Sequence, residues 1–191
     1  IALDRRPEAG AATVLVGDDR AGWQLRVGRQ QHFVFLGRPD PEAAADEHRV
    51  TLTFNASGKF ECRWVTLLPA SQTCIWTAGL DEPVACPVAH GEGRFVVSSP
   101  RELEMLKEGN QIALVYGLAG GEPAGDAYPE NPNGSVAGIA GICNRSGNVL
   151  GLMPHPENHV FPWQFPDKSR APFGSGLRIF QNGTAYAARY Q

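Results

Sequence analysis

The sequence predicts an α/β domain with an antiparallel extension, and three observations carry the prediction. Strand-like stretches outnumber helical ones from residue 49 onward. One segment between two of these stretches has the signals of a capped helix. Two late stretches flank a short turn, which is the pattern of an antiparallel hairpin.

Six stretches have the alternating or continuous apolar pattern of β-strands. They are residues 49–54, 60–68, 94–97, 111–116, 136–143 and 148–153. The first two lie on either side of a turn at residues 55–58, and the last two flank a turn at residues 144–147. The loop at residues 117–135 is rich in Gly, Pro and Asn, and its length predicts a functional or disordered segment.

Two helices are predicted. Ser99 and Glu102 form a capping box with Pro100 at the first helical position, and Gly109 follows where the helix should end.

A second helix closes the chain. Its expected inner face consists of Leu177, Phe180, Thr184 and Ala187, and the Asn-Gly pair at residues 182–183 weakens it.

The first 49 residues differ from the rest. Two short apolar stretches lie in text rich in Arg, Asp, Ala and Gly that shows little helical period. We therefore divide the chain into an unassigned, divergent N-terminal segment (1–49) and a recognisable part (50–191).

Composition narrows the class of protein. The chain is 42% hydrophobic with a net charge of −3, as in ordinary soluble globules, so it offers no basic field for nucleic acid or an anionic membrane. It has no apolar run long enough to span a bilayer and no signal peptide at its start. The four cysteines lack CxxC spacing, which favours reduced thiols in a cytoplasmic protein over a zinc site.

One segment has the residues for acid–base chemistry. His155 and Glu157 follow a buried strand, and the prolines at 154 and 156 hold the backbone extended, so both side chains should point to one side. The carboxylate can then fix the imidazole tautomer, and the free ring nitrogen can take a proton from a nucleophile. Two alternatives stay open: a solvated loop with an incidental His and Glu, and a metal site that includes His159.

Five sequence blocks occur in one order. They are NASGKFECRW (55–64), PVAHGEGRF (87–95), YPENPNGS (128–135), IAGIC (139–143) and GLMPHPE (151–157). The series resembles the glutaminase subunit or domain of phosphoribosylformylglycinamidine synthase, the ATP-dependent amidating ligase of purine biosynthesis. The resemblance runs from about residue 50 to the C-terminus.

The resemblance implies a fold and an activity. The fold would be the flavodoxin-like, three-layer α/β domain of class I glutamine amidotransferases, with its C-terminal half recognisable and its N-terminal half truncated or divergent. The chain would release ammonia from glutamine for a synthetase, either fused or separate, that holds Mg-ATP. No cofactor or metal is expected in this chain. Two other functions are kept: a non-hydrolysing remnant that docks on the synthetase, and a stand-alone glutamine or γ-glutamyl hydrolase.

The resemblance also implies roles for single residues. His155 would be the general base and Glu157 its orienter. The remaining candidates would line the glutamine pocket or face the synthetase; they are His90, Gly91, Glu92, Arg94 and Asn133.

The nucleophile is the point of departure from the resemblance. The family needs a cysteine on a tight Gly-x-Cys-x-Gly turn before the matched region, and residues 1–50 hold no cysteine. Cys143 imitates that turn, but a hairpin follows it in place of a helix. Cys62, Cys74 and Cys86 are interpreted as small buried hydrophobic residues.

Overall fold

The computed structural model describes residues 27–28, 31–32, 50–167 and 176–190. Its main element is a five-stranded sheet in the order β5-β4-β7-β8-β9, in which every neighbouring pair is antiparallel. These strands are β4 (Glu61–Pro69), β5 (Val84–His90), β7 (Ile112–Gly117), β8 (Ile139–Cys143) and β9 (Leu150–Leu152). The predicted hairpin of the last two strands is confirmed, because β8 pairs with β9 across residues 144–149.

Four strands lie outside this sheet, in two antiparallel pairs. β3 (Val50–Thr53) pairs with β6 (Arg94–Val97), and the short β1 (Val27–Gly28) pairs with β2 (Gln31–His32). β3 and β4 flank the predicted turn but do not pair with each other. The Asn55 amide donates to the backbone oxygens of Lys59 and His90, which ties this turn to the end of β5.

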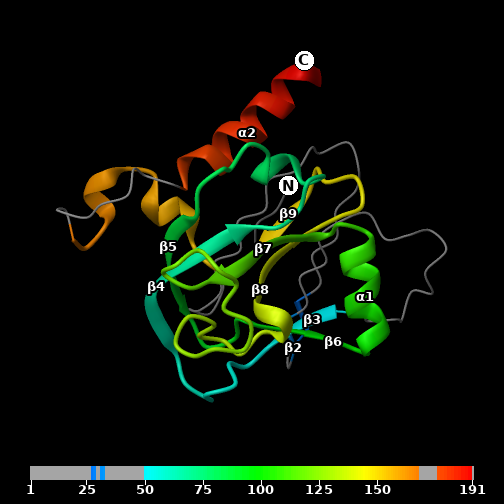
Figure 1. Cartoon of the computed structure of the whole chain (residues 1–191), viewed down its shortest axis with the longest axis vertical. Coiled ribbons are helices and arrows are strands. Elements are labelled where there is room, and N and C mark those ends of the chain that lie inside the picture. The colour runs from blue at the N-terminus through cyan, green and yellow to red at the C-terminus, as the bar shows by residue number, and fades with distance from the viewer. Residues whose placement is uncertain (1–26, 29–30, 33–49, 168–175, 191) are drawn as a thin grey trace.

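The two helices lie in different parts of the molecule, one at the right and one at the top of Figure 1. Each packs on a different apolar cluster. α1 (Pro100–Glu108) contributes Leu106 to the smaller cluster, beside Phe95 of β6 and Ile139 of β8. α2 (Leu177–Ala187) contributes Ile179 to the larger cluster, beside Trp76 of the short 3₁₀ helix η1 (Ile75–Thr77). The five-stranded sheet contributes to both clusters, so it lies between them. The remaining 3₁₀ turns are η2 (Val136–Gly138), η3 (Pro156–His159), η4 (Pro162–Gln164) and η5 (Ala188–Tyr190).

The capping signals of α1 are confirmed. The backbone N–H of Glu102 donates to the Ser99 side chain, Pro100 opens the helix, and Gly109 is its C-terminal cap. The N-terminal end of α1 could be predicted from the sequence because the residues of a helix cap lie within four positions of each other.

The predicted inner face of α2 is wrong. Leu177 and Thr184 are exposed, and the buried positions are Ile179 and Gly183. A Cβ atom at position 183 would lie 2.6 Å from Cη2 of Trp76, so the missing side chain is what allows α2 to lie on that ring. The Asn-Gly pair therefore serves close packing at a cost in helix propensity.

Replacing Gly183 by Ala should lower the free energy of unfolding, although helix propensity alone would predict an increase. Alanine is better than glycine in a helix by about 1 kcal/mol. Here the new methyl group overlaps Trp76, whose indole N–H is held by the Asn148 carbonyl oxygen at 3.1 Å, so we expect a net loss of about 1–3 kcal/mol. Urea unfolding measures the loss, with Gln181→Ala at an exposed position of the same helix as control. A more stable Gly183→Ala variant would contradict this packing.

The long loop at residues 117–135 is ordered by its own asparagines. The Asn131 amide donates to the backbone oxygens of Gly125 and Ser135, and its side-chain oxygen accepts from the Ser135 N–H. Asn131 and Asn133 are both buried, at 1% and 0% exposure. Of the two expectations for this loop, disorder is therefore wrong.

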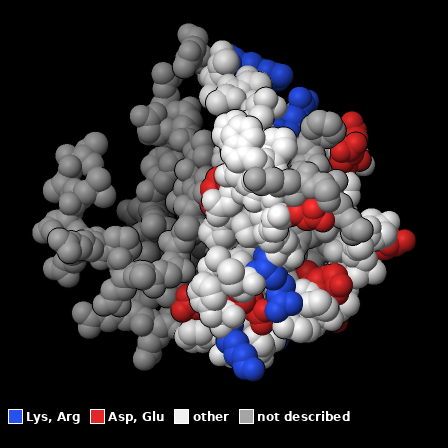
Figure 2. All heavy atoms as spheres, turned by 90° about the vertical axis from the view of Figure 1, so that its left-hand side faces the viewer, with Lys and Arg blue, Asp and Glu red and all other residues white. Residues whose placement is uncertain are grey.

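The described part of one face of the molecule carries both positive and negative side chains. On the face shown in Figure 2, acidic and basic side chains are interspersed, and neither sign forms a continuous field. Among the described residues, no helix is long and apolar enough to cross a membrane.

Candidate active site

His155 and Glu157 are in contact. The Nδ1 atom of His155 lies 2.8 Å from Oε1 of Glu157, and their side chains are 9% and 33% exposed. The contact forms differently from the prediction: the chain does not continue extended after His155 but enters the 3₁₀ turn η3, which brings Glu157 back to the ring. An ionised carboxylate only accepts hydrogen bonds, so Nδ1 carries the proton and the lone pair is on Nε2. The arrangement can therefore serve base catalysis, and the catalytic roles stay predictions.

The backbone around this pair is tied to the sheet. The N–H of His155 donates to the Pro87 carbonyl oxygen of β5 at 2.9 Å, and the N–H of Gly176 donates to the His159 carbonyl oxygen at 3.0 Å. A Cβ atom at Gly176 would lie 2.8 Å from the carbonyl carbon of Pro156, so only glycine allows this approach. These contacts hold the main chain at both ends of η3.

His159 is engaged away from the pair. Its Nδ1 lies 2.6 Å from the Ala85 carbonyl oxygen, and its ring meets Trp64 edge-on at 5.2 Å. Within the described ranges, no group of three His, Cys, Asp or Glu side chains is arranged to hold a metal ion. The contacts of His159 are those of a packed core histidine, which disfavours the metal alternative.

His90 ends β5 inside the protein, at 1% exposure. Its Nδ1 lies 3.2 Å from the Asn133 amide nitrogen, which also donates to Oδ1 of Asn55 at 2.7 Å. The Tyr116 hydroxyl donates to Oδ1 of Asn133 at 2.7 Å. The two most distant members of this network are 78 positions apart in the sequence, yet all four meet at the ends of β3, β5 and β7.

The other candidates of the His-Gly-Glu-Gly-Arg block lie nearer the surface. Gly91, Glu92 and Arg94 are half-buried, and Nε of Arg94 donates to the Gly134 carbonyl oxygen at 3.1 Å. The glycine that permits a close approach is Gly93, and the group that it admits is the His90 ring. The glutamine-lining or partner-facing roles of these residues stay predictions.

Asn55 and Tyr116 were not among the site residues predicted from the sequence. Both are buried polar residues, at 3% and 0% exposure, and each bonds Asn133 in the loop at residues 117–135. A polar residue directly after a strand, such as Asn55, is the one local signal for such a network.

Stability should fall when the solution is acidified because of His90. Burial, followed by the neighbouring His155, lowers the pKa of His90 from its ordinary value of 6.5 to about 4. The unfolded chain takes up this proton below about pH 6.5, whereas the folded chain stays neutral to about pH 4. The contribution of neutral His90 to the free energy of unfolding is therefore complete above about pH 6.5. It is lost as the pH falls from about 6.5 toward about 4, by about 2–3 kcal/mol between pH 7 and pH 4.5.

Urea unfolding at both pH values tests this effect. The variant His90→Gln does not titrate, so its loss on acidification should be smaller than that of the unchanged protein by the same amount. An equal loss in both proteins would mean that His90 is not the residue that takes up the proton.

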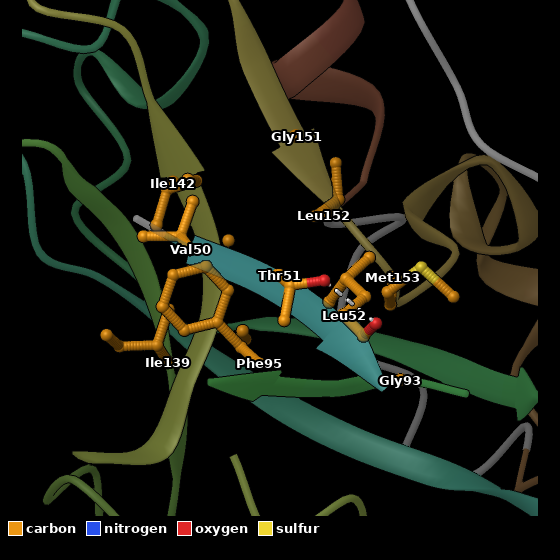
Figure 3. Close-up of a pocket in the computed structure, with 12 residues that line it drawn as sticks. Val50, Thr51, Leu52, Gly93, Phe95, Ile139, Ile142, Gly151, Leu152 and Met153 are labelled. Atoms are coloured by element: carbon orange, nitrogen blue, oxygen red, sulfur yellow. Dashed lines mark hydrogen bonds between the residues drawn. The ribbon is translucent and has the colours of Figure 1, made fainter. Parts of the chain in front are cut away.

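A small pocket lies beside the site (Figure 3). It measures about 30 Å³ and is lined from β3, β6, β8 and β9, with Val50, Phe95 and Ile139 toward one end and Leu152 and Met153 toward the other. That volume suits one or two water molecules and is far too small for glutamine. Its lining holds no charged side chain, so it provides no partner for the charges of an amino acid.

The four cysteines do not complete the pair. Cys74 and Cys86 are buried, as predicted, and Cys143 is buried too, whereas Cys62 is exposed, so its predicted burial is wrong. The strand β4 turns Val65 and Leu67 inward, and Cys62 shares the opposite face with the exposed Phe60.

None of these thiols hydrogen-bonds the His155 ring within the described part of the chain. Burial, together with the charge of Glu157, raises the pKa of Cys86, and a hydrogen bond with Cys74, together with burial, raises that of Cys143. A raised pKa removes the thiolate that a nucleophile needs.

A buried imidazole oriented by a carboxylate is an arrangement that can supply the base and its orienter to a site that uses a nucleophile. The chain belongs to the family of CobB/CobQ-like glutamine amidotransferase domains, which it matches over residues 31–187. This match begins inside the segment that the sequence analysis left unassigned, and the boundary at residue 49/50 stays a prediction.

The chain is similar to proteins named phosphoribosylformylglycinamidine synthase subunit PurQ. The protein from Treponema denticola is 57% identical over 115 residues, which cover 59% of this chain and 43% of the relative. The protein from Archaeoglobus fulgidus is 40% identical over 154 residues, covering 78% of this chain and 55% of the relative. The chain thus spans about half the length of the curated relatives that it matches.

A solved structure supports the fold. The structure of PurLQS from Thermotoga maritima matches with a TM-score of 0.52 and 30% identity, covering 73% of this chain and 54% of the matched chain. The predicted α/β fold of a class I glutamine amidotransferase is therefore confirmed. Within the described residues the strand pairs are all antiparallel, which is the antiparallel extension that the sequence predicts.

Proposed function

We propose that this chain provides the base-and-orienter half of the glutaminase site of phosphoribosylformylglycinamidine synthase. The observation that carries the proposal is the 2.8 Å contact between His155 and Glu157, which leaves Nε2 of a buried imidazole available as a base. The names of the relatives supply the reaction: each of the two compared above is a synthase subunit.

The chemistry follows from the geometry. Nε2 of His155 takes the proton of a cysteine thiol, and the thiolate attacks the side-chain amide carbon of glutamine. The ammonia leaves with the proton that His155 returns, and water then hydrolyses the thioester to glutamate. Glu157 stabilises the imidazolium that forms between these transfers. None of the four cysteines of this chain hydrogen-bonds the His155 ring in the described structure, so the proposal assigns the thiol to none of them.

The partner would be the synthetase, which holds Mg-ATP and uses the ammonia, and the site of action would be the cytoplasm. A rim suited to docking adjoins the His90 network. Tyr128 is 61% exposed, and the Arg63 guanidinium lies 4.8 Å from the centre of its ring. Glu92 and Arg94 are half-exposed on the same connection as Gly91. Such charged and aromatic groups are common at protein–protein interfaces.

A chimera tests the function. Residues 50–190 of this chain replace the matching part of the Treponema denticola relative, and the chimera is assayed with the synthetase subunit of that organism. We expect glutamine-dependent amidation, and we expect His155→Ala to abolish it while amidation from added ammonium persists. Amidation from ammonium alone would favour the docking remnant. Glutamine hydrolysis that needs no synthetase would favour the stand-alone hydrolase.

A further inference from the structure

The amide orientations beside His90 are fixed by backbone groups. The Asn55 amide nitrogen faces two carbonyl oxygens, those of Lys59 and His90, each at 2.8 Å. Oδ1 of Asn55 must therefore be the atom that accepts from the Gly93 N–H at 3.0 Å. A carbonyl has no hydrogen to donate and a backbone N–H has no lone pair, so this assignment has no alternative.

The Asn55 orientation fixes its neighbour in turn. Oδ1 of Asn55 already acts as an acceptor, so the Asn133 atom 2.7 Å away is the amide nitrogen. The same nitrogen faces Nδ1 of His90 at 3.2 Å, and Nδ1 must therefore accept. A neutral imidazole that accepts at Nδ1 carries its proton at Nε2. His90 is thus held in the Nε2–H form by a chain of contacts that begins at the backbone.

The Nε2 atom of His90 is buried and makes no hydrogen bond of good geometry among the described residues, although a backbone group of Met153 lies close enough to favour the protonated ring. Leaving a buried donor unpaired is unfavourable, so its location calls for a physical explanation. The ring lies 6.3 Å from the His155 ring, centre to centre, and faces the backbone of Met153, two residues before His155. His90 ends the strand whose Pro87 carbonyl holds the His155 N–H.

We propose that His90 is a positioning residue for His155, presenting its Nε2–H donor to the Met153–His155 strand end that carries the base. This inference rests on the proposed function, because it assigns His155 as the base. His90 does not touch the reacting atoms. It holds the main chain from which the base projects, and its neutral state keeps a second positive charge away from the imidazolium that forms on His155.

Nitrogen NMR of the imidazole rings tests the first half of the inference on the whole chain as it stands. Long-range ¹H–¹⁵N spectra at pH 7 should show His90 as the Nε2–H form and His155 as the Nδ1–H form. Observation of His90 as the Nδ1–H form would overturn the inference without any variant.

Three variants test the second half. His90→Asn removes the donor, His90→Gln keeps an N–H near the Nε2 position, and Tyr116→Phe loosens the network without changing the Asn133 orientation. The readouts are the His155 tautomer and hydrogen exchange at the His155 amide, compared with amides of the β4–β7 ladder. In His90→Asn, we expect hydrogen exchange at the His155 amide to become at least tenfold faster relative to exchange at the amides of the β4–β7 ladder. We also expect a smaller population of the Nδ1–H form of His155. His90→Gln and Tyr116→Phe should leave both readouts near those of the unchanged protein.

Exchange at His155 that changes only in step with the ladder would reduce His90 to a stability role and overturn the inference. If His90→Asn does not fold, the inference is decided by comparing His90→Gln with Tyr116→Phe. Faster exchange at the His155 amide in His90→Gln, with normal exchange in Tyr116→Phe, would overturn the inference, because the donor retained in His90→Gln should be sufficient. These measurements need no enzymatic activity. A negative result in these measurements would not contradict the proposed glutaminase function. Lack of glutamine-dependent amidation by the chimera would not contradict the tautomer assigned to His90.

Discussion

Replacing Glu157 by Gln should lower glutamine-dependent amidation by about 10³–10⁴-fold in the chimera, with little change in fold. Oε1 of Glu157 holds the proton on Nδ1 of His155 from 2.8 Å. An amide nitrogen in that place donates instead of accepting, which favours the wrong imidazole tautomer and leaves the developing imidazolium without a countercharge. The effect should fall on kcat, because the interaction strengthens only as the imidazole becomes charged.

The control for this experiment is Asn158→Ala. Asn158 is the exposed neighbour of Glu157 in η3, and the hydrogen bond that it makes to His155 uses only its backbone N–H. It should therefore retain full activity. Amidation from added ammonium should survive in both variants, because that step belongs to the synthetase. A Glu157→Gln variant that loses both activities, or neither, would mean that the pair is structural.

The elements that could be predicted from the sequence depend on neighbouring residues. Ser99, Pro100 and Glu102 act within one helical turn, and the alternation of β4 and the turn after β8 are equally local. Strand pairing could not be predicted in the same way. β3 precedes β4 along the chain but pairs with β6, and the Asn55 side chain that follows β3 bonds the end of β5, 35 positions away.

The same distinction separates the two parts of the site. The contact between His155 and Glu157 spans two residues, so the short motif was sufficient to predict it. The network around His90 joins residues from three strands, and its tautomer follows only from contacts that no spacing rule encodes. The prediction of the inner face of α2 was wrong for a related reason. A glycine lowers helix propensity, and the sequence does not show that Trp76 fills the space beside Gly183.

Replacing Gly93 by Ala should destabilise the protein by about 3 kcal/mol, whereas the same change at Gly91 should stay within about 0.5 kcal/mol. A Cβ atom at position 93 would overlap the His90 ring and lie 2.7 Å from the Asn133 amide nitrogen. At position 91 a Cβ atom meets nothing within 4 Å. The two glycines are two residues apart in one block, so the pair separates packing from any general effect of removing glycine.

The His90 ring cannot move aside to admit the new methyl group in Gly93→Ala. Nδ1 is held by Asn133, the backbone carbonyl of His90 is held by Asn55, and the ring is fully enclosed. Relief would require breaking that network, which exposes buried polar groups without partners and adds to the steric cost. Urea unfolding of both variants at pH 7 measures the difference. If Gly93→Ala is as stable as Gly91→Ala, the ring has room to shift, and the rigid orientation of His90 on which its positioning role depends is wrong.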